Sequence, residues 1–340
     1  MKRWILPLLV AMSWFFLIGA AYLQTPGSSG SPPQTALFND ANFTARMVPF
    51  IIALGIIVGI YEARKVFQNG SDQVLNDSVR RHDSSVIILH WMNAFGLIVG
   101  LVSGAIVLRW VNNRPDQLRP IFIIHYLGAS LVLFAIFAHL TRQGVSGGIG
   151  LIPKGLGVIR DLIGELFGYL GVFGPDEAVV RIPWPGAIRK PIARYVKALL
   201  GYKEANTGKY LATEQTVSYP PWAILIGIIV VTGLIKMLRY VYPLPNTLIA
   251  SVTAIHDLAA IGIGLMLVIH LLPLLLVPAN WPLLLSIFRT TVPLEYVKKR
   301  HPAWYRQLTE KTAERPVIVT KPVVEEGQTS PGTVETTSAD

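Results

Sequence analysis

The sequence contains no cysteine among its 340 residues. This excludes disulfide bonds, thiolate metal sites and iron–sulfur clusters held by this chain, so any redox centre must use other side chains. Charged residues are also few, at 15% of the chain, whereas 52% of the residues are hydrophobic and the mean hydropathy is +0.48. A soluble protein of this length does not need so much apolar surface, so the composition indicates a membrane protein.

Long apolar runs account for this composition, and each is near the ~20 residues that a helix needs to cross the hydrocarbon core. The runs cover residues 5–24, 47–63, 84–108, 120–141, 220–238 and 249–277. The sequence therefore predicts an all-α, multi-pass membrane protein with six possible spans. The first run follows Lys2 and Arg3 and ends in small residues, so residues 1–24 fit either a cleavable signal peptide or a first transmembrane helix.

The positive charge follows the expected membrane topology. Bases concentrate in residues 64–81, 142–219 and 298–300 and are sparse in residues 25–46 and 240–247. By the positive-inside rule the former regions are cytoplasmic, together with the C-terminus, and the latter are external. Three arginines in a loop expected outside argue against this assignment: Arg109, Arg114 and Arg119. The net charge of +10 is thus explained by topology, and we expect no nucleic-acid partner.

The remaining segments divide around a core over residues 80–310. Residues 25–79 are expected to contain an external linker, an additional transmembrane helix and a cytoplasmic loop. Residues 142–219 form a cytoplasmic insertion whose first part is apolar but interrupted by charges, which favours an interfacial helix over another span. Residues 311–340 are low in aromatics and rich in Thr, Glu and Pro, so disorder is expected there.

Five histidines lie inside the predicted spans. His125 and His139 share one span and His256 and His270 another, and both pairs are separated by fourteen residues. Fourteen helical residues rise about 21 Å and fall about 40° short of four turns, so both rings of a pair leave the same helix face. His90 occupies a third span. One intramembrane histidine can be a simple helix-to-helix hydrogen bond, whereas an array usually marks a proton relay, an ion path or a cofactor.

Two bound haems, each held by two histidines, would explain four of these five residues. A low-spin haem takes one axial ligand on each face of the iron, and neutral imidazoles supply both without adding charge to the bilayer. Matched depth pairs His125 with His256 near the external side and His90 with His270 near the cytoplasmic side, while His139 with His270 stays open as an alternative inner pair. Glycines near these histidines would let a flat porphyrin approach the backbone, although glycine is also common in ordinary membrane helices. The glycines in question are Gly96, Gly100, Gly104 and Gly128.

Four segments resemble one known family. They are "RRHDSSVIILHWMNAFGLIVGLVSG", "IIHYLGASLVLF", "SVTAIHDLAAIGIGLMLVIHLLP" and, after the last span, "VKKRHPAWYRQL". Together they resemble the four-helix, dihaem cytochrome b subunit of membrane-bound formate dehydrogenase, its gamma subunit. This family belongs to the superfamily of cytochrome b561 and of the cytochrome b of nickel–iron hydrogenases. The resemblance covers roughly residues 80–310 and implies a four-helix dihaem bundle with one or two extra N-terminal helices.

The resemblance also implies ligands. His90 and His270 correspond to the axial ligands of a cytoplasmic-side b-type haem, and His125 and His256 to those of an outer one. A quinone site is implied beside the inner haem, where "EANTGKY" offers Asn206 and Gly208, although the following segment "LATEQTVSYPP" is longer than in the family. Asn-Thr-Gly is also an ordinary turn sequence. His301 matches the family's cytoplasmic ending and is not expected to bind haem.

The implied function is electron transfer in a bacterial inner membrane. Electrons from a molybdenum or tungsten formate dehydrogenase subunit would pass through an iron–sulfur subunit and two b-type haems to menaquinone or ubiquinone, and this chain itself would not oxidise formate. The closest alternative is the cytochrome b of a hydrogenase or thiosulfate-reductase complex. A proton-coupled transporter with relay histidines is the alternative of another class, and a bare membrane anchor leaves the histidines unexplained.

Overall fold

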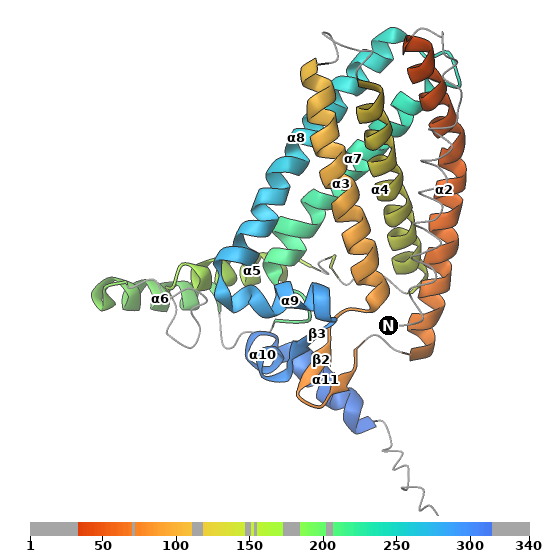
Figure 1. Ribbon diagram of the computed structural model, residues 1–340. Coiled ribbons are helices and arrows are strands. Elements are labelled where there is room, and N and C mark those ends of the chain that lie inside the picture. Colours follow the sequence, from red (N-terminus) through yellow and green to blue (C-terminus); the bar gives the residue numbers. More distant parts are fainter. Residues whose placement is uncertain are drawn as a thin grey trace, which may run out of the picture.

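The computed structural model describes residues 33–69, 72–110, 118–146, 151–152, 155–172, 184–201 and 207–314 (Figure 1). Within these ranges five helical stretches are long and apolar enough to cross a membrane: Leu37–Val66, Ser84–Leu108, Arg119–Val145, Glu214–Leu238 and Asn246–Leu276. They confirm the prediction of an all-α, multi-pass membrane protein. The first apolar run, and with it the choice between signal peptide and helix, lies outside the described residues.

Helices α3 (Ser84–Trp110) and α4 (Arg119–Val145) form one antiparallel pair with close backbone contact. A Cβ atom on Gly96 would lie 2.7 Å from the carbonyl oxygen of Gly128, and one on Gly128 would lie 3.0 Å from that of Gly96. Small residues allow this approach, as they commonly do between membrane helices. These two glycines therefore pack helix on helix rather than against a porphyrin, which corrects the expectation for them.

Helix α2 (Pro33–Asn69) covers the outer side of α4. Gly55 and Gly59 bring the two backbones together, because a Cβ on Gly59 would lie 2.6 Å from the carbonyl oxygen of Ala138. At the far end the buried Asp40 carboxylate accepts two hydrogen bonds from Arg119, at 2.7 and 3.2 Å. The helix thus starts well before the predicted residue 47, and an ion pair neutralises one of the arginines that opposed the charge-based topology.

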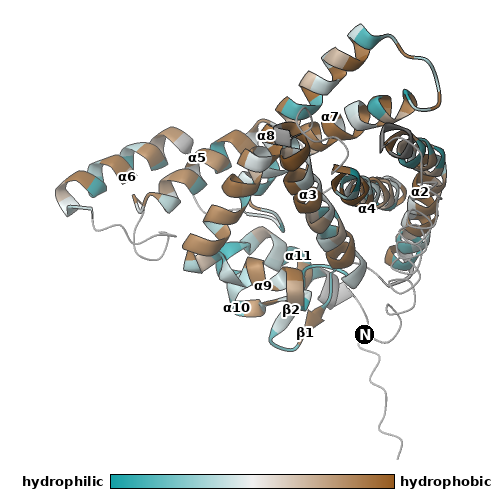
Figure 2. Cartoon of the chain, turned by 45° about the horizontal axis from the view of Figure 1, so that its top comes forward, coloured by the Kyte–Doolittle hydropathy of each residue, from teal (hydrophilic) through white to brown (hydrophobic). Residues whose placement is uncertain are grey.

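Helices α7 (Tyr219–Leu238) and α8 (Asn246–Leu276) form the second pair, and α7 continues from a π-helical turn, η2 (Glu214–Ser218). Backbone contact is extensive within each pair and sparse between α3–α4 and α7–α8. Figure 2 shows hydrophobic residues along all the spans, with hydrophilic residues gathered towards their ends. The four core helices are therefore arranged as two hairpins set side by side, each presenting histidines.

A small folded unit, here called the cap, lies below one end of the spans (Figure 1). It contains an antiparallel sheet of β1 (Val74–Leu75), β2 (Ser78–Arg80) and β3 (Thr291–Pro293), with helices α10 (Leu294–Arg300) and α11 (Pro302–Glu314). Its core consists of Val79, Val292, Val297, Trp304 and Leu308. Between α8 and β3 the chain forms a short 3-10 turn, η3 (Pro278–Asn280), and α9 (Trp281–Arg289).

The insertion after α4 contains two short helices, α5 (Gly157–Tyr169) and α6 (Gly186–Leu200), which project sideways (Figure 1). At 13 and 15 residues they rise about 20 Å each, too little to span a bilayer. At the other end of the chain α11 continues to Glu314, so the predicted disorder from residue 311 is wrong for residues 311–314. The rest of that tail lies outside the described residues.

Candidate functional site

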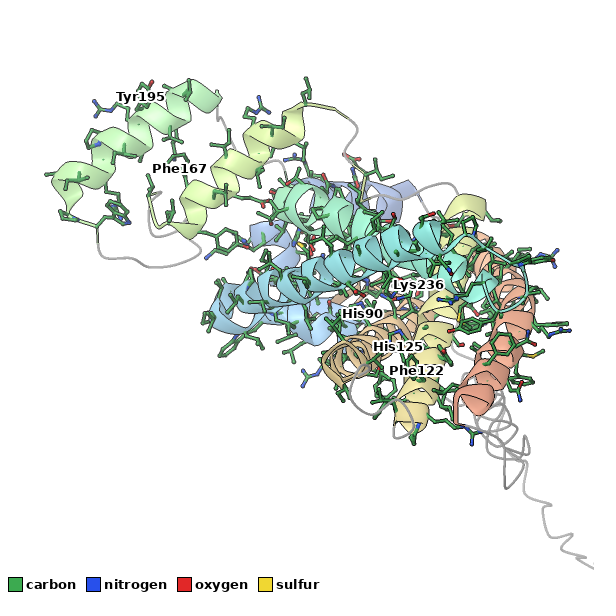
Figure 3. The ribbon with its side chains drawn as sticks, turned by 90° about the horizontal axis from the view of Figure 1, so that it is seen from above. His90, Phe122, His125, Phe167, Tyr195 and Lys236 are labelled. Carbon is green, nitrogen blue, oxygen red and sulfur yellow. The ribbon has the colours of Figure 1, made fainter. Side chains whose placement is uncertain are left out.

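The pair far from the cap consists of His125 on α4 and His256 on α8. Their ring centroids are 6.5 Å apart and their planes are inclined at 67°. The two helices belong to different hairpins, so the two rings meet across the space between the hairpins. Figure 3 shows the labelled His90, His125 and Lys236 in the middle of the bundle. The structure therefore brings together the two histidines that depth matching paired on the distal side.

The Nδ1 atoms of both rings have hydroxyl partners on the neighbouring helix. His125 Nδ1 lies 3.0 Å from Ser103 Oγ and 3.1 Å from the Gly100 carbonyl oxygen, and His256 Nδ1 lies 2.9 Å from Thr232 Oγ1. Each hydroxyl donates its own hydrogen to a helix carbonyl 2.6 Å away, so its oxygen is left to accept from the imidazole. Both rings are consequently held as the Nδ1–H tautomer, with Nε2 unprotonated and able to coordinate a metal.

The two halves of this arrangement are alike. Ser103 is followed by Gly104, and a Cβ there would lie 3.5 Å from Cε1 of His125; Thr232 is followed by Gly233, where a Cβ would lie 3.5 Å from Cε1 of His256. Each hairpin thus supplies a histidine from one helix and a hydroxyl followed by glycine from the other. The repeated unit fixes each ring through its Nδ1 atom.

The separation of the two rings matches the spacing that two imidazoles bound to one haem iron would have. Metal–imidazole bonds are about 2 Å, and the ring centre lies about 1 Å behind the coordinating nitrogen, so two axial imidazoles have centroids about 6 Å apart. The observed separation is 6.5 Å. Among the residues that the structure describes, no three histidine or carboxylate side chains gather as they would around a protein-held metal ion.

The pair near the cap consists of His90 on α3 and His270 on α8. The two rings lie near enough to interact electrostatically, and each has a tryptophan edge against it: Trp91 at 5.6 Å from His90 and Trp222 at 6.2 Å from His270, centroid to centroid. His139 has its electrostatic neighbour, Arg142, on its own helix. The structure therefore brings His90 toward His270, as depth matching expected, and gives His139 a different environment.

Gly208, one of the two residues expected at a quinone site, lies beside a polar cavity. Asn206 is outside the described residues, whereas the carbonyl of Gly208 accepts a 2.7 Å hydrogen bond from Nδ1 of His301. A cavity of about 310 Å³ opens next to it. Its lining comes from α5 and from the segment before α7, and includes Asp161, Glu165, Thr207, Gly208, Tyr210 and Gln215.

Glu165 anchors one wall of that cavity. Its two carboxylate oxygens accept hydrogen bonds from the backbone amides of Ala212 at 2.8 Å and Thr213 at 2.9 Å. Burial raises the pKa of this carboxyl, and the two amides partly oppose the rise. Burial likewise raises the pKa of the Tyr210 phenol above its usual value. The cavity thus combines hydroxyl, amide and carboxyl groups in a partly desolvated setting.

His301 joins the cap to the segment before α7. It is fully buried, and burial, reinforced by the charge of Arg81, lowers its pKa to about 3. The ring is therefore neutral at pH 7. Its hydrogen bond to Gly208, together with a backbone bond from Ala303 N to Thr207 O at 3.1 Å, attaches the C-terminal helices to residues 207–208. His301 therefore has a structural role here, and the expectation that it does not bind haem stays a prediction.

Several residues that shape the site were missed in the sequence. Ser103 and Thr232 carry no distinctive motif beyond a hydroxyl followed by glycine. Lys236 on α7 lies near enough to His125 and His256 to interact electrostatically with both. An ionisable residue inside a predicted span is by itself a signal of function, so Lys236 was detectable.

Comparison with known proteins identifies no relative. No family model matches the chain, and neither a curated protein nor a solved structure does so. A functional conclusion therefore rests on the geometry of the histidines and their partners, together with the resemblance of the sequence segments.

Proposed function

We propose that this chain is a dihaem cytochrome b, the membrane subunit that connects an electron-donating complex on one side of a membrane with quinone on the other. The observation that carries the proposal is the His125–His256 pair, with centroids 6.5 Å apart and each Nδ1 bound to a hydroxyl of its own hairpin. The partner complex, the family and both cofactors rest on the sequence resemblance together with this geometry.

The residues assigned to each haem follow from the pairs. His125 and His256 would hold the distal group, and His90 and His270 the one near the cap. A b-type haem supplies a reversible one-electron centre when bound. Ser103 and Thr232 orient the distal rings and keep Nε2 unprotonated. Lys236 lies near enough to the same rings to interact with them electrostatically, and its ammonium group would favour a bound group that carries negative charge.

The cavity beside Gly208 is the proposed place for the quinone head group, with a volume of about 310 Å³. Tyr210, Thr207 and Gln215 offer hydrogen bonds to quinone oxygens, and Glu165 and Asp161 offer carboxyl groups on its wall. Proton uptake from the cytoplasmic side would make the electron transfer separate charge across the membrane.

We further propose that the electron donor is a molybdenum or tungsten formate dehydrogenase acting through an iron–sulfur subunit. In this proposal the complex sits in a bacterial inner membrane with the C-terminus in the cytoplasm. Menaquinone or ubiquinone is the acceptor. A hydrogenase or thiosulfate-reductase complex would use the same haem sites with a different partner.

A proton-coupled transporter is the alternative of another class, and one observation weighs against it. The Nδ1 atom of each ring is bound to a hydroxyl of its own hairpin, and no hydrogen bond joins the rings of His125 and His256 directly. This supports two separate ligands over a relay in which the two imidazoles exchange a proton directly.

The proposal is tested with the purified protein in liposomes. Dithionite is added, absorption spectra are recorded, and a menaquinone or ubiquinone analogue follows. We expect reduced b-type bands that quinone reoxidises, bands of half amplitude in His270→Ala with loss of rapid reoxidation, and wild-type behaviour in His139→Ala. A folded protein without haem bands, or one that transports protons with a solute instead, would overturn the proposal.

The partner is tested separately in membranes of the native host. Formate, hydrogen and thiosulfate are supplied in parallel, and reduction or oxidation of the haem bands is followed. Formate-dependent reduction supports the formate dehydrogenase assignment. A response to hydrogen or thiosulfate alone would overturn that assignment and leave the cytochrome b intact.

A further inference from the structure

Helices α5 and α6 form an arm that reaches beyond the outline of the bundle. Figure 1 shows both helices lying roughly across the direction of the spans, at the end where the cap begins, and Figure 3 shows Phe167 and Tyr195 in this arm well away from the core histidines. An interfacial helix has this orientation, because it lies in the plane of the membrane surface. The arm is therefore placed where a bilayer surface passes the protein.

The two helices of the arm pack against each other, and α5 is bonded to the rest of the protein. Val196 of α6 is buried against Ile163 and Phe167 of α5, with Ile192 and Ala193 beside it. Helix α5 is attached in turn to the segment before α7 through Glu165, and to η3 through Tyr169, whose hydroxyl lies 3.1 Å from Asn280 Nδ2. The contacts between α6 and α5, and those between α5 and the rest of the protein, hold α6 in a defined position relative to the bundle.

Helix α6 leaves an apolar stripe uncovered. Ile188, Tyr195 and Leu199 are 49%, 69% and 70% exposed, respectively, and their spacing of seven and four residues places them on one helix face. On α5, Ile159 and Leu166 are also exposed, at 49% and 46%. Large apolar side chains exposed in a row are a sign of a surface that is covered by an apolar partner.

The other side of α6 is basic. Its sequence, GAIRKPIARYVKALL, has four bases and no acidic residue. At 100° per residue Lys190, Arg194 and Lys197 fall on the face opposite the apolar stripe. Hydrophobic and hydrophilic residues alternate along α6 in Figure 2. A helix with Lys and Arg on one face and aliphatic and aromatic residues on the other matches anionic membrane surfaces, since long basic side chains extend to the lipid phosphates.

We propose that the α5–α6 arm is a lipid-binding element that lies in the membrane surface on the cap side, with Ile188, Tyr195 and Leu199 among the acyl chains and the bases of α6 at the phosphates of anionic lipids. The arm tethers the segment that lines the cavity, because α5 supplies Glu165 and Asp161 to its wall. The inference does not depend on the haems, since it rests only on the arm's orientation, exposure and charge.

The absence of cysteine gives a direct test. Leu199→Cys provides a single labelling position on the stripe, and Thr309→Cys on the exposed face of α11 serves as the control position. Both are labelled with an environment-sensitive fluorophore in nanodiscs of phosphatidylcholine alone or with phosphatidylglycerol, and quenching by lipids brominated on their acyl chains is measured. We expect quenching at residue 199, at least twofold stronger with phosphatidylglycerol, and little at residue 309.

The charge requirement is tested on the same background. Arg194→Gln with Lys197→Gln is expected to abolish the preference for phosphatidylglycerol at residue 199. Lys298→Gln with Lys299→Gln removes the same charge from exposed positions of α10 and is expected to leave the preference unchanged. No quenching at residue 199 in either lipid would overturn the membrane-bound arm, and equal quenching in both lipids would overturn its anionic selectivity. Haem content is measured in each sample, so failure of the haem proposal is seen separately.

Discussion

His125 and His256 lie across from each other with ring centroids 6.5 Å apart, and both are oriented by hydroxyls from the second helix of their own hairpin. This relationship joins two hairpins whose backbones otherwise have little mutual contact. A group coordinated by both rings would consequently hold the two halves of the bundle together, so ligand binding and folding are expected to be coupled.

Replacing Thr232 by Val removes the hydroxyl that orients His256 and keeps the side-chain volume nearly the same. We expect the haem to remain bound but with about tenfold weaker retention, because outer-shell partners of this kind commonly contribute that much. The midpoint potential of the distal haem should rise, since the imidazole becomes a poorer electron donor. Redox titration measures this. Thr309→Val on α11, whose hydroxyl bonds only to its own helix, is the matched control.

The pair near the cap is tested by comparing His90→Ala with His139→Ala. We expect the first variant to lose one haem per chain and the second to lose none, because His90 lies near enough to His270 to interact with it electrostatically. Pyridine haemochrome quantitation decides the question. Loss of haem from His139→Ala with retention in His90→Ala would support the alternative inner pair.

The ion pair between Arg81 and Glu214 ties the cap to the start of α7. The two partners are 133 residues apart in sequence, the guanidinium donates to both carboxylate oxygens at 2.9 and 3.0 Å, and the Arg81 side chain is 2% exposed. We expect Arg81→Gln to destabilise the cap by about 2 kcal/mol, a reduced value for a buried pair because Glu214 is partly exposed. Limited proteolysis and hydrogen exchange of residues 291–314 measure this.

A control for Arg81→Gln is available on α5. Arg160 and Asp161 form an exposed pair at 3.7 Å with side chains 57% and 46% exposed. Arg160→Gln should change the stability of the cap by less than about 0.5 kcal/mol. If Arg81→Gln and Arg160→Gln changed the stability of the cap equally, the burial of the Arg81–Glu214 pair would not be the reason for its contribution.

Gly59 allows α2 to lie directly on α4. A Cβ there would lie 2.6 Å from the Ala138 carbonyl oxygen. We therefore expect Gly59→Ala to push α2 away from α4 and to lower the free energy of unfolding by roughly 1–3 kcal/mol. Gly227→Ala is the matched control, since a Cβ at that position in α7 meets nothing within 4 Å. Thermal unfolding in detergent compares the two variants.

His301 gives the cap a stability that depends on pH. Its pKa is about 3 in the folded protein against an ordinary value of 6.5, so the unfolded chain binds a proton first as the pH falls. The contribution to stability is complete above pH 6.5 and is lost on acidification toward about pH 3, with a slope of at most about 1.4 kcal/mol per pH unit. His301→Gln should flatten the pH profile of hydrogen exchange in α10 and α11 between pH 7 and 5. An unchanged profile would contradict the assigned role.

The sequence was sufficient to predict the five spans that lie within the described residues, because length and apolarity alone determine them. It placed the ends of some helices wrongly: α2 begins at Pro33, where polar residues such as Asp40 are tolerated because Arg119 pairs with them. The sheet of the cap was missed, since strands of two or three residues have no detectable alternation and β3 joins β2 from more than 200 positions away. Local pattern carries no information on such pairings.

The candidate site was predicted only in part. Depth and helical spacing paired His125 with His256. The hydroxyl partners of these histidines lie on other helices, so they could not be assigned before the hairpins were placed. Gly96 and Gly128 were expected beside a porphyrin and instead pack α3 on α4, because close helix contact and cofactor contact require the same small residue.

The most direct test of the account is the haem content of the purified wild-type chain and of His256→Ala, measured as pyridine haemochrome per mole of protein. We expect two b-type haems per chain in the wild type and one in the variant, with both proteins folded as judged by circular dichroism. Folded wild-type protein without haem would contradict the account and turn the same histidines into candidates for proton transfer.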